Sequence, residues 1–236
     1  MKRLAKAAEL LDGPLDPVLL EGNLRDLARV NRWLGGGSLT WRALMPFLAI
    51  DRPTTLLDVG TGAADIPRDL LRRAAAANLR LEIRATDVRP EIVRIAARQS
   101  DGVGGLDVGL VSDQRVAEPD KSWDIVHGSL LLHHLEPAAA APLLADMARV
   151  ARRAVIVNDL ERGRAWWLGA WLLTRVATGN RYTRNDAPLS VRRAYRAGEV
   201  RAMAEQAGLR FAAEHRSMPP YRYALVFAPP LEAAHA

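Results

Sequence analysis

Strand-like and helix-like segments alternate regularly through the middle of the chain, and this alternation constrains the fold most strongly. Short β-branched and leucine-rich runs are separated by stretches with the apolar spacing of helices. Such alternation predicts right-handed strand–helix–strand units and a parallel, doubly wound sheet with helices on both faces. We expect strands at 54–59, 81–86, 108–112, 123–128 and 154–158, and helices at 66–77, 90–98 and 138–152.

The N-terminal fifty residues precede this alternation and have helical spacing throughout. Residues 17–34 form one expected helix, and a second begins with Ser38 as its cap. Between them lie three consecutive glycines, 35–37, which are free to take positive φ. These glycines either end the first helix or act as a hinge. We therefore interpret residues 1–50 as a helical lid.

The C-terminal third breaks the alternation. Residues 161–190 contain a tryptophan-rich helix and then a polar stretch that we interpret as a loop, so we predict a cap insertion over about 161–195. A further helix is expected at 199–207. Two last strands, 209–214 and 221–228, are too close for a helical crossover and should pair as an antiparallel hairpin. Residues 51–236 then form one α/β domain.

Composition narrows the class of protein. The chain has 236 residues and no cysteine, which excludes disulfides, thiolate metal sites and a cysteine nucleophile. Its net charge is +6, but arginines are scattered along the chain, which favours a compositional bias over a nucleic-acid surface. The apolar segment Ala165–Leu173 is too short to span a membrane, and no signal peptide is evident. We expect a cytoplasmic protein with no membrane span and no nucleic-acid partner.

The stretch Asp58–Ala64 is a glycine-rich turn between the first strand and the following helix. Gly60 and Gly62 allow a sharp turn and close approach of a ligand to the backbone. A dinucleotide fingerprint would place a third glycine at Asp65, whose carboxylate would repel a pyrophosphate, and no Gly-Lys-Ser/Thr follows. A nucleoside without phosphates, carrying a cationic sulfonium and an amino group, suits the nearby acids.

A second acid, Asp87, ends the second strand. A carboxylate there can accept hydrogen bonds from both hydroxyls of a ribose. The alternative is that Asp87 only caps the helix that begins at Pro90. The two roles can coexist.

Together these motifs resemble the class I S-adenosylmethionine-dependent methyltransferases over about residues 54–228. Ala64 stands where a third glycine is common, and Asp113 matches an acid that meets the adenine amino group. The resemblance implies a Rossmann-like seven-stranded sheet of order 3-2-1-4-5-7-6, with the last strand antiparallel, and S-adenosylmethionine as cofactor. The implied cofactor residues are Asp58, Gly60, Thr61, Gly62, Asp65, Asp87, Val88, Asp113, Gln114, Ser129 and Leu130.

Within that class, residues 130–135 look most similar to the ubiquinone/menaquinone-biosynthesis and small-molecule branch. Nucleic-acid branches usually carry Asn/Asp-Pro-Pro-Tyr/Phe after the fourth strand, where this chain has Gly128-Ser129-Leu130. The resemblance implies methylation of a phenolic, quinol-like or polyketide-type hydroxyl, or of an activated carbon. The alternatives are an RNA methyltransferase and a non-catalytic partner protein with the same fold. A monomer and a homodimer are equally compatible with the sequence.

His133 and His134 follow the fourth strand, beside the expected methyl group. A hydroxyl acceptor benefits from a base, and histidine suits that role at neutral pH, so we predict His134, with His133 as second choice, as catalytic. The alternative is a packed turn. We predict no metal, because adjacent residues point in different directions and no third ligand is evident. For the aromatic or lipophilic acceptor we predict contacts with Trp33, Trp166, Trp167, Arg181 and Tyr182, although core packing or a solvated loop would explain them equally.

Overall fold

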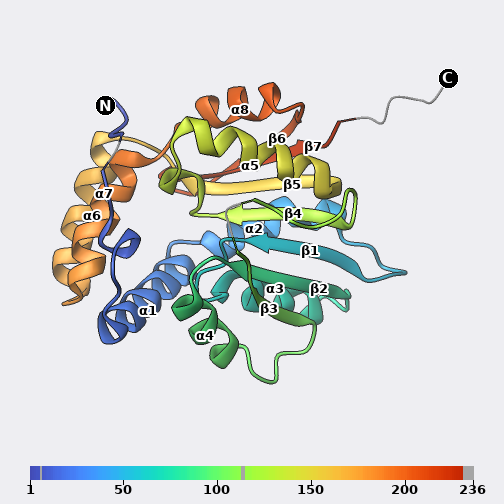
Figure 1. Ribbon diagram of the computed structural model, residues 1–236, viewed down its shortest axis with the longest axis horizontal. Coiled ribbons are helices and arrows are strands. Elements are labelled where there is room, and N and C mark those ends of the chain that lie inside the picture. Colours follow the sequence, from blue (N-terminus) through green and yellow to red (C-terminus); the bar gives the residue numbers. More distant parts are fainter. Residues whose placement is uncertain (6, 113–114, 231–236) are drawn as a thin grey trace.

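A single sheet lies at the centre of the molecule. The computed structural model describes residues 1–5, 7–112 and 115–230, and within them seven strands form one sheet in the order β3-β2-β1-β4-β5-β7-β6 (Figure 1). Strands β1 to β5 pair in parallel, whereas β7 is antiparallel to both β5 and β6, which confirms the predicted order. The strands are β1 (Thr54–Val59), β2 (Leu81–Asp87), β3 (Leu106–Leu110), β4 (Trp123–Ser129), β5 (Ala151–Leu160), β6 (Arg210–Arg216) and β7 (Arg222–Ala228).

Helices cover both faces of this sheet. On one face α2 packs on β5, β6 and β7, while α3 packs on β2 and β3; on the other, α5 packs on β4 and β5, and α8 on β6 and β7. The helices are α1 (Pro17–Trp33), α2 (Gly36–Leu44), α3 (Asp65–Ala76), α4 (Pro90–Gln99), α5 (Pro137–Val150), α6 (Arg164–Ala177), α7 (Arg181–Arg193) and α8 (Ala197–Gln206), with 3-10 turns η1 (Leu10–Asp12), η2 (Met45–Phe47) and η3 (Leu132–His134).

Strand β1 has apolar residues pointing to both faces of the sheet. Successive strand residues point to opposite faces of the sheet. Leu56 is buried in the core beneath α2 and α3, and Leu57 is buried in the core beneath α5 and α8. Because both faces are covered, both positions are apolar, as in parallel sheets generally.

The sequence analysis was wrong about residues 181–190, which form most of helix α7 and not a loop. Asn180 caps this helix by accepting hydrogen bonds from the N–H groups of Tyr182 and Thr183. Its buried face is largely polar and includes Thr183, Asp186 and Arg193. Hydrophobic periodicity cannot show such a helix, because hydrogen bonds replace apolar contacts on its inner face.

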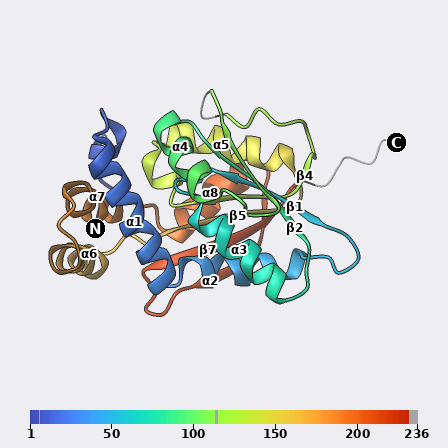
Figure 2. The same cartoon turned by 90° about the horizontal axis from the view of Figure 1, so that it is seen from below.

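The structure places the two parts of residues 1–50 differently. Helix α2 belongs to the layer that covers the sheet, whereas η1 and α1 lie at one end of the molecule beside α7 (Figure 1 and Figure 2). Gly35, with φ of 78°, separates α1 from α2. The second helix begins at Gly36 and not after Ser38. Gly36 lies so close to Arg222 and Asn31 that a Cβ would approach them to 2.6 Å, so a larger residue would not fit there.

Helices α6 and α7 form a pair at this same end, where the carboxyl ends of the parallel strands also lie (Figure 1). In the described part of the chain, no helix combines the length and the apolar character needed to cross a bilayer.

Candidate active site

A cavity of about 500 Å³ lies at the carboxyl ends of β1, β2 and β4. Such a crevice is where ligands bind in open α/β sheets. Two of the cofactor residues expected from the sequence, Asp113 and Gln114, lie outside the described residues, and their neighbours Arg115 and Val116 line the cavity. The remaining expected cofactor residues all line it: Asp58, Gly60, Thr61, Gly62, Asp65, Asp87, Val88, Ser129 and Leu130.

The glycine turn has the backbone geometry that its sequence implies. Gly60 and Gly62 have φ of 69° and 58°, and Ala64, the N-cap of α3, has φ of 54°. A Cβ on Gly60 would come within 2.7 Å of the Leu131 side chain, whereas a Cβ on Gly62 would meet no atom within 4 Å. Gly62 therefore leaves open space on the cavity wall, where a ligand can lie directly against the main chain.

Asp87 ends β2 and lines the cavity, and its carboxylate does not cap α4, whose N-cap is Arg89 without a side-chain cap hydrogen bond. It is buried, and its carboxylate accepts hydrogen bonds from the N–H of Gly62 at 3.1 Å and from the N–H of Arg89, just before α4, also at 3.1 Å. Burial raises its pKa, and these backbone donors oppose that rise. The two bonds leave acceptor capacity on a carboxylate that lines the cavity, which fits the ribose of a nucleoside.

Asp58 and Asp65, the two acids of the glycine turn, each contact a buried polar side chain. The Asp58 carboxylate lies 2.5 Å from Nδ1 of His127, and Asp65 accepts a hydrogen bond of 2.9 Å from the Asn31 amide. Burial raises the pKa of Asp65, whereas the Asn31 hydrogen bond lowers it. The Asn31 amide oxygen in turn accepts from the buried guanidinium of Arg222 at 2.7 Å. This chain of contacts positions α1 over the cavity.

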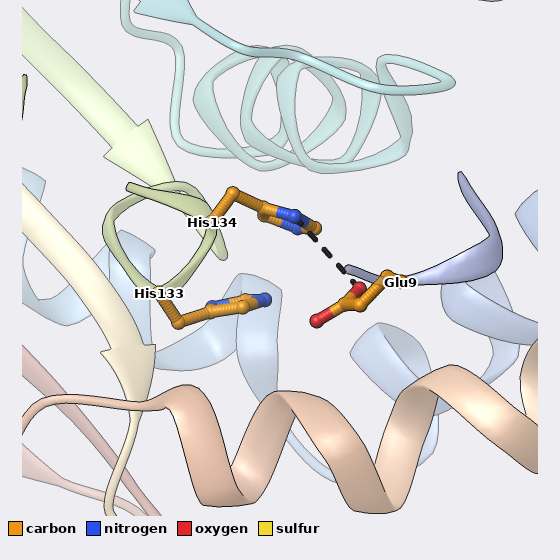
Figure 3. Close-up of side chains that lie close together, drawn as sticks. All are labelled: Glu9, His133 and His134. Atoms are coloured by element: carbon orange, nitrogen blue, oxygen red, sulfur yellow. Dashed lines mark ion pairs between the residues drawn. The ribbon is translucent and has the colours of Figure 1, made fainter. Parts of the chain in front are cut away.

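His133 and His134 lie in the turn η3, directly after β4. Their ring centroids are 4.3 Å apart with the planes tilted by 34°, so the expectation that adjacent histidines point in different directions is wrong (Figure 3). The reason is Asp159, which accepts hydrogen bonds from both the backbone N–H and the ring Nδ1 of His133, the latter at 2.7 Å. His133 is thereby fixed and buried.

His134 lines the cavity and keeps part of its ring exposed. Its Nδ1 lies 3.5 Å from the Asp12 carboxylate and 3.8 Å from that of Glu9, both from the N-terminal segment. Although burial opposes ionisation, hydrogen bonds from His134 and Arg193 hold the pKa of Asp12 well below its usual value. We call Glu9, Asp12, His133 and His134 the histidine cluster.

The histidine cluster includes a set of ligands that could hold a metal ion, because atoms of Glu9, His133 and His134 lie within 4.8 Å of one another. Glu9 is the third ligand that the sequence did not reveal. However, Glu9 already accepts a hydrogen bond of 2.9 Å from Ser190, and a carboxylate oxygen lies 3.7 Å from the Arg193 guanidinium. The Arg193 guanidinium already supplies a positive charge beside the carboxylates of Glu9 and Asp12. The arrangement therefore favours proton transfer by His134 over binding of a divalent metal ion.

Comparison with known proteins supports the interpretation of the cavity. Residues 56–154 match a family described as a methyltransferase domain. This part of the chain is therefore a methyltransferase domain, and the protein is an enzyme.

Solved structures share the fold of this methyltransferase at low sequence identity. An S-adenosylmethionine-dependent methyltransferase from Aquifex aeolicus aligns with a TM-score of 0.64 and 19% identity, over 91% of this chain and 99% of that one. Human N-acetylserotonin methyltransferase in complex with S-adenosylmethionine aligns with a TM-score of 0.66 and 14% identity, over 90% of this chain and 56% of that one. An O-methyltransferase family 2 protein from Planctomyces limnophilus in complex with apigenin aligns with a TM-score of 0.65 and 16% identity. The alignment covers 92% of this chain and 62% of that one. Comparison with curated proteins gave no match.

The residues expected to contact the acceptor do not line the cavity of this methyltransferase. Trp33 and Arg181 are exposed, and Trp166 and Trp167 are half-buried on α6. Tyr182 is buried, and its hydroxyl accepts a hydrogen bond of 2.9 Å from the Asp16 N–H. The expectation fails because α6 packs against α7 and not against the cavity, a placement that composition alone does not reveal.

An apolar wall is instead contributed by side chains from four separate parts of the chain. These are Leu11, Leu24, Leu27, Ile92, Leu131, Leu135 and Leu143. Asp12 and His134 line the same cavity. No local motif marks the N-terminal leucines, because only the tertiary fold brings them to the strand ends.

Proposed function

We propose that this methyltransferase transfers a methyl group to a hydroxyl of an aromatic or lipophilic small molecule of phenolic, quinol-like or polyketide type, with an activated carbon as the alternative acceptor atom. The observation that carries the proposal is His134, which lines the cavity beside Asp12 and Glu9 and next to an apolar wall. A base flanked by carboxylates within apolar surroundings suits an acceptor with one weakly acidic hydroxyl.

The glycine turn and Asp87 are the residues we propose to hold the cofactor. Gly62 offers the open backbone surface, Asp87 the acceptor for ribose hydroxyls, and Ser129 with Leu130 the segment for the methionine part. When bound, S-adenosylmethionine supplies a methyl group already activated by the adjacent sulfonium charge. The protein then has to align the acceptor, exclude water and accept one proton.

His134 is proposed to take the proton of the acceptor hydroxyl. Asp12 and Glu9 lie on the Nδ1 side of its ring, where their charge stabilises the imidazolium that forms. Arg193 holds this side together, because it donates to Asp12 at 2.8 Å and to the backbone carbonyls of His133 and His134. His133 is a positioning residue, fixed by Asp159.

Two of the solved structures support a small acceptor. The Planctomyces limnophilus protein was crystallised with apigenin, and the human protein is an N-acetylserotonin methyltransferase. Each shares the fold at low identity, so the support extends to the size of molecule that the fold accommodates.

The test is transfer of a labelled methyl group from S-adenosylmethionine to a panel of phenols, quinols and cell extract, followed by mass spectrometry. We expect one small-molecule product, and His134→Gln to lower kcat by roughly 10²- to 10⁴-fold with S-adenosylhomocysteine affinity unchanged. His215→Gln, on β6, is the matched control and should retain full activity. Label recovered in RNA, or an undiminished rate for His134→Gln, would contradict the proposal.

A further inference from the structure

Helix α6 exposes a large apolar surface. Leu168, Trp171, Leu172, Leu173 and Val176 are each between 38% and 89% exposed. Its half-buried or buried positions are Trp166, Trp167, Ala170 and Thr174, which lie together on the opposite side of the helix. Apart from its two arginines and one threonine, this helix is apolar on all sides. A helix of that kind is normally surrounded by protein or lipid, yet here only its half-buried side is packed, against α7 and, through Trp166, against Tyr221.

The charged side chains of α6 and of the segment that follows it, as far as residue 185, are all arginines. Arg164, Arg175, Arg181 and Arg184 are exposed, and no aspartate or glutamate occurs from residue 162 to residue 185. Within the described residues, none of these four arginines forms an ion pair with a carboxylate. Arg175 instead stacks on Trp171, with its guanidinium 4.9 Å from the ring centroid. The chain as a whole carries +6.

We propose that α6 rests on the surface of an anionic lipid bilayer. Tryptophan and leucine side chains would enter the boundary between headgroups and acyl chains, to a depth of about 5–10 Å. The flanking arginines would reach the lipid phosphates, because their long aliphatic stems allow the charge to stay at the surface. Helix α6 has 14 residues and is about 21 Å long, too short to span a bilayer core of about 30 Å.

Charge favours lipid over a second copy of this chain. A twofold pairing of α6 with itself would bring arginines against arginines, with no acidic residue in the same segment to compensate. An anionic membrane offers both an apolar layer and the opposite charge. The proposal concerns a surface outside the cavity, and it stands whatever the methyl acceptor is.

The experiment is flotation of the full chain with vesicles of phosphatidylcholine alone and of phosphatidylcholine mixed with phosphatidylglycerol. We expect binding to the mixed vesicles only, weakening as salt is raised. Val176→Glu should abolish binding. Ile50→Glu is the matched control and should bind as the natural chain does. Ile50 is 86% exposed, close to the 89% of Val176, but it lies before the amino end of β1, whereas α6 lies at the end of the molecule where the parallel strands have their carboxyl ends.

A second pair of substitutions tests whether the arginines beside α6 contribute to vesicle binding. Arg164→Gln with Arg181→Gln should weaken binding roughly fivefold for each arginine at low salt. The proposal is overturned if the natural chain ignores both vesicle types at low salt, or if Ile50→Glu reduces binding as much as Val176→Glu. It is equally overturned if light scattering shows a dimer that Val176→Glu dissociates and vesicles do not bind. None of these measurements depends on methyl transfer, so the proposed function is tested separately.

Discussion

The two halves of the cavity are constructed in different ways. The cofactor half consists of turns that directly follow β1, β2 and β4, so each short stretch of chain carries its own site residues. The other half is closed by the cover, by which we mean η1, α1 and α7. There the N–H groups of Leu10 and Leu11 donate to the Asp186 carboxylate, although Asp186 follows them in the sequence by 176 and 175 residues, respectively.

The difference lies in what specifies each half. Positive φ at Gly60 and Gly62 is a backbone requirement, and the amino-acid type reveals it. The cover depends on partly buried hydrogen bonds that polar side chains form with distant segments, such as Arg193 with Asp12 and Tyr182 with the Asp16 N–H. Polar residues of that kind are equally common in solvated loops. Four substitutions test this difference between the two halves of the cavity.

The largest effect is expected in the cover. Arg193→Met would leave the buried Glu9 carboxylate and Asp12 without their guanidinium. We expect the free energy of unfolding to fall by about 3–5 kcal/mol, as when one partner of a buried ion pair is removed. Urea unfolding measures it, with Arg192→Met, the exposed neighbour on α7, as control. Equal small losses for both variants would show that the cover does not depend on this network.

In the cofactor half, Asp87→Ala should weaken S-adenosylhomocysteine binding. Loss of hydrogen bonds to a charged acceptor costs about 1.5–3 kcal/mol, roughly 10- to 100-fold in affinity. Titration calorimetry gives the affinity, and circular dichroism verifies that the variant is folded. Asp107→Ala, on β3 and 66% exposed, is the control. An unchanged affinity for Asp87→Ala would remove this residue from the cofactor site.

The pH dependence of binding follows from the same carboxylate. Burial raises the pKa of Asp87, so the ionised form is lost as pH falls through a value above the ordinary 3.8. Protonation removes acceptors for the ribose, and affinity for S-adenosylhomocysteine should fall by at most about tenfold per pH unit. In Asp87→Asn this dependence should flatten. A natural chain whose affinity is constant from neutral pH down to the ordinary pKa would contradict it.

The smallest effect is expected at Ala64, which is buried with φ of 54°. Ala64→Gly relieves about 1–2 kcal/mol of left-handed strain but loses a buried methyl worth about 0.8 kcal/mol, so stability should change little. Ala63→Gly is the control, because Ala63 is buried without positive φ and should lose stability. Thermal unfolding compares the two, and equal destabilisation would show that the turn is unstrained at Ala64.

The parallel, doubly wound sheet and its antiparallel final hairpin followed from the sequence, because alternating strands and helices permit few topologies and the final pair is too closely spaced for a crossover. The order of the strands came from the resemblance to the methyltransferase family. The glycine turn, Asp87 and the two histidines could also be located from the sequence, because each lies at or shortly after the carboxyl end of a predicted strand. These features depend on backbone conformation and on short-range order. They are properties that a single stretch of chain specifies by itself.

The tertiary structure alone decided which side chains meet across long separations. It placed Asp12 and Glu9 beside His134, Arg222 beside Asn31, and the tryptophans of α6 outside the cavity. It also made residues 181–193 a helix, because the buried face of α7 is stabilised by hydrogen bonds to the N-terminal segment. A polar side chain carries no local sign of its partner, so these contacts exist only once the distant segments have packed together.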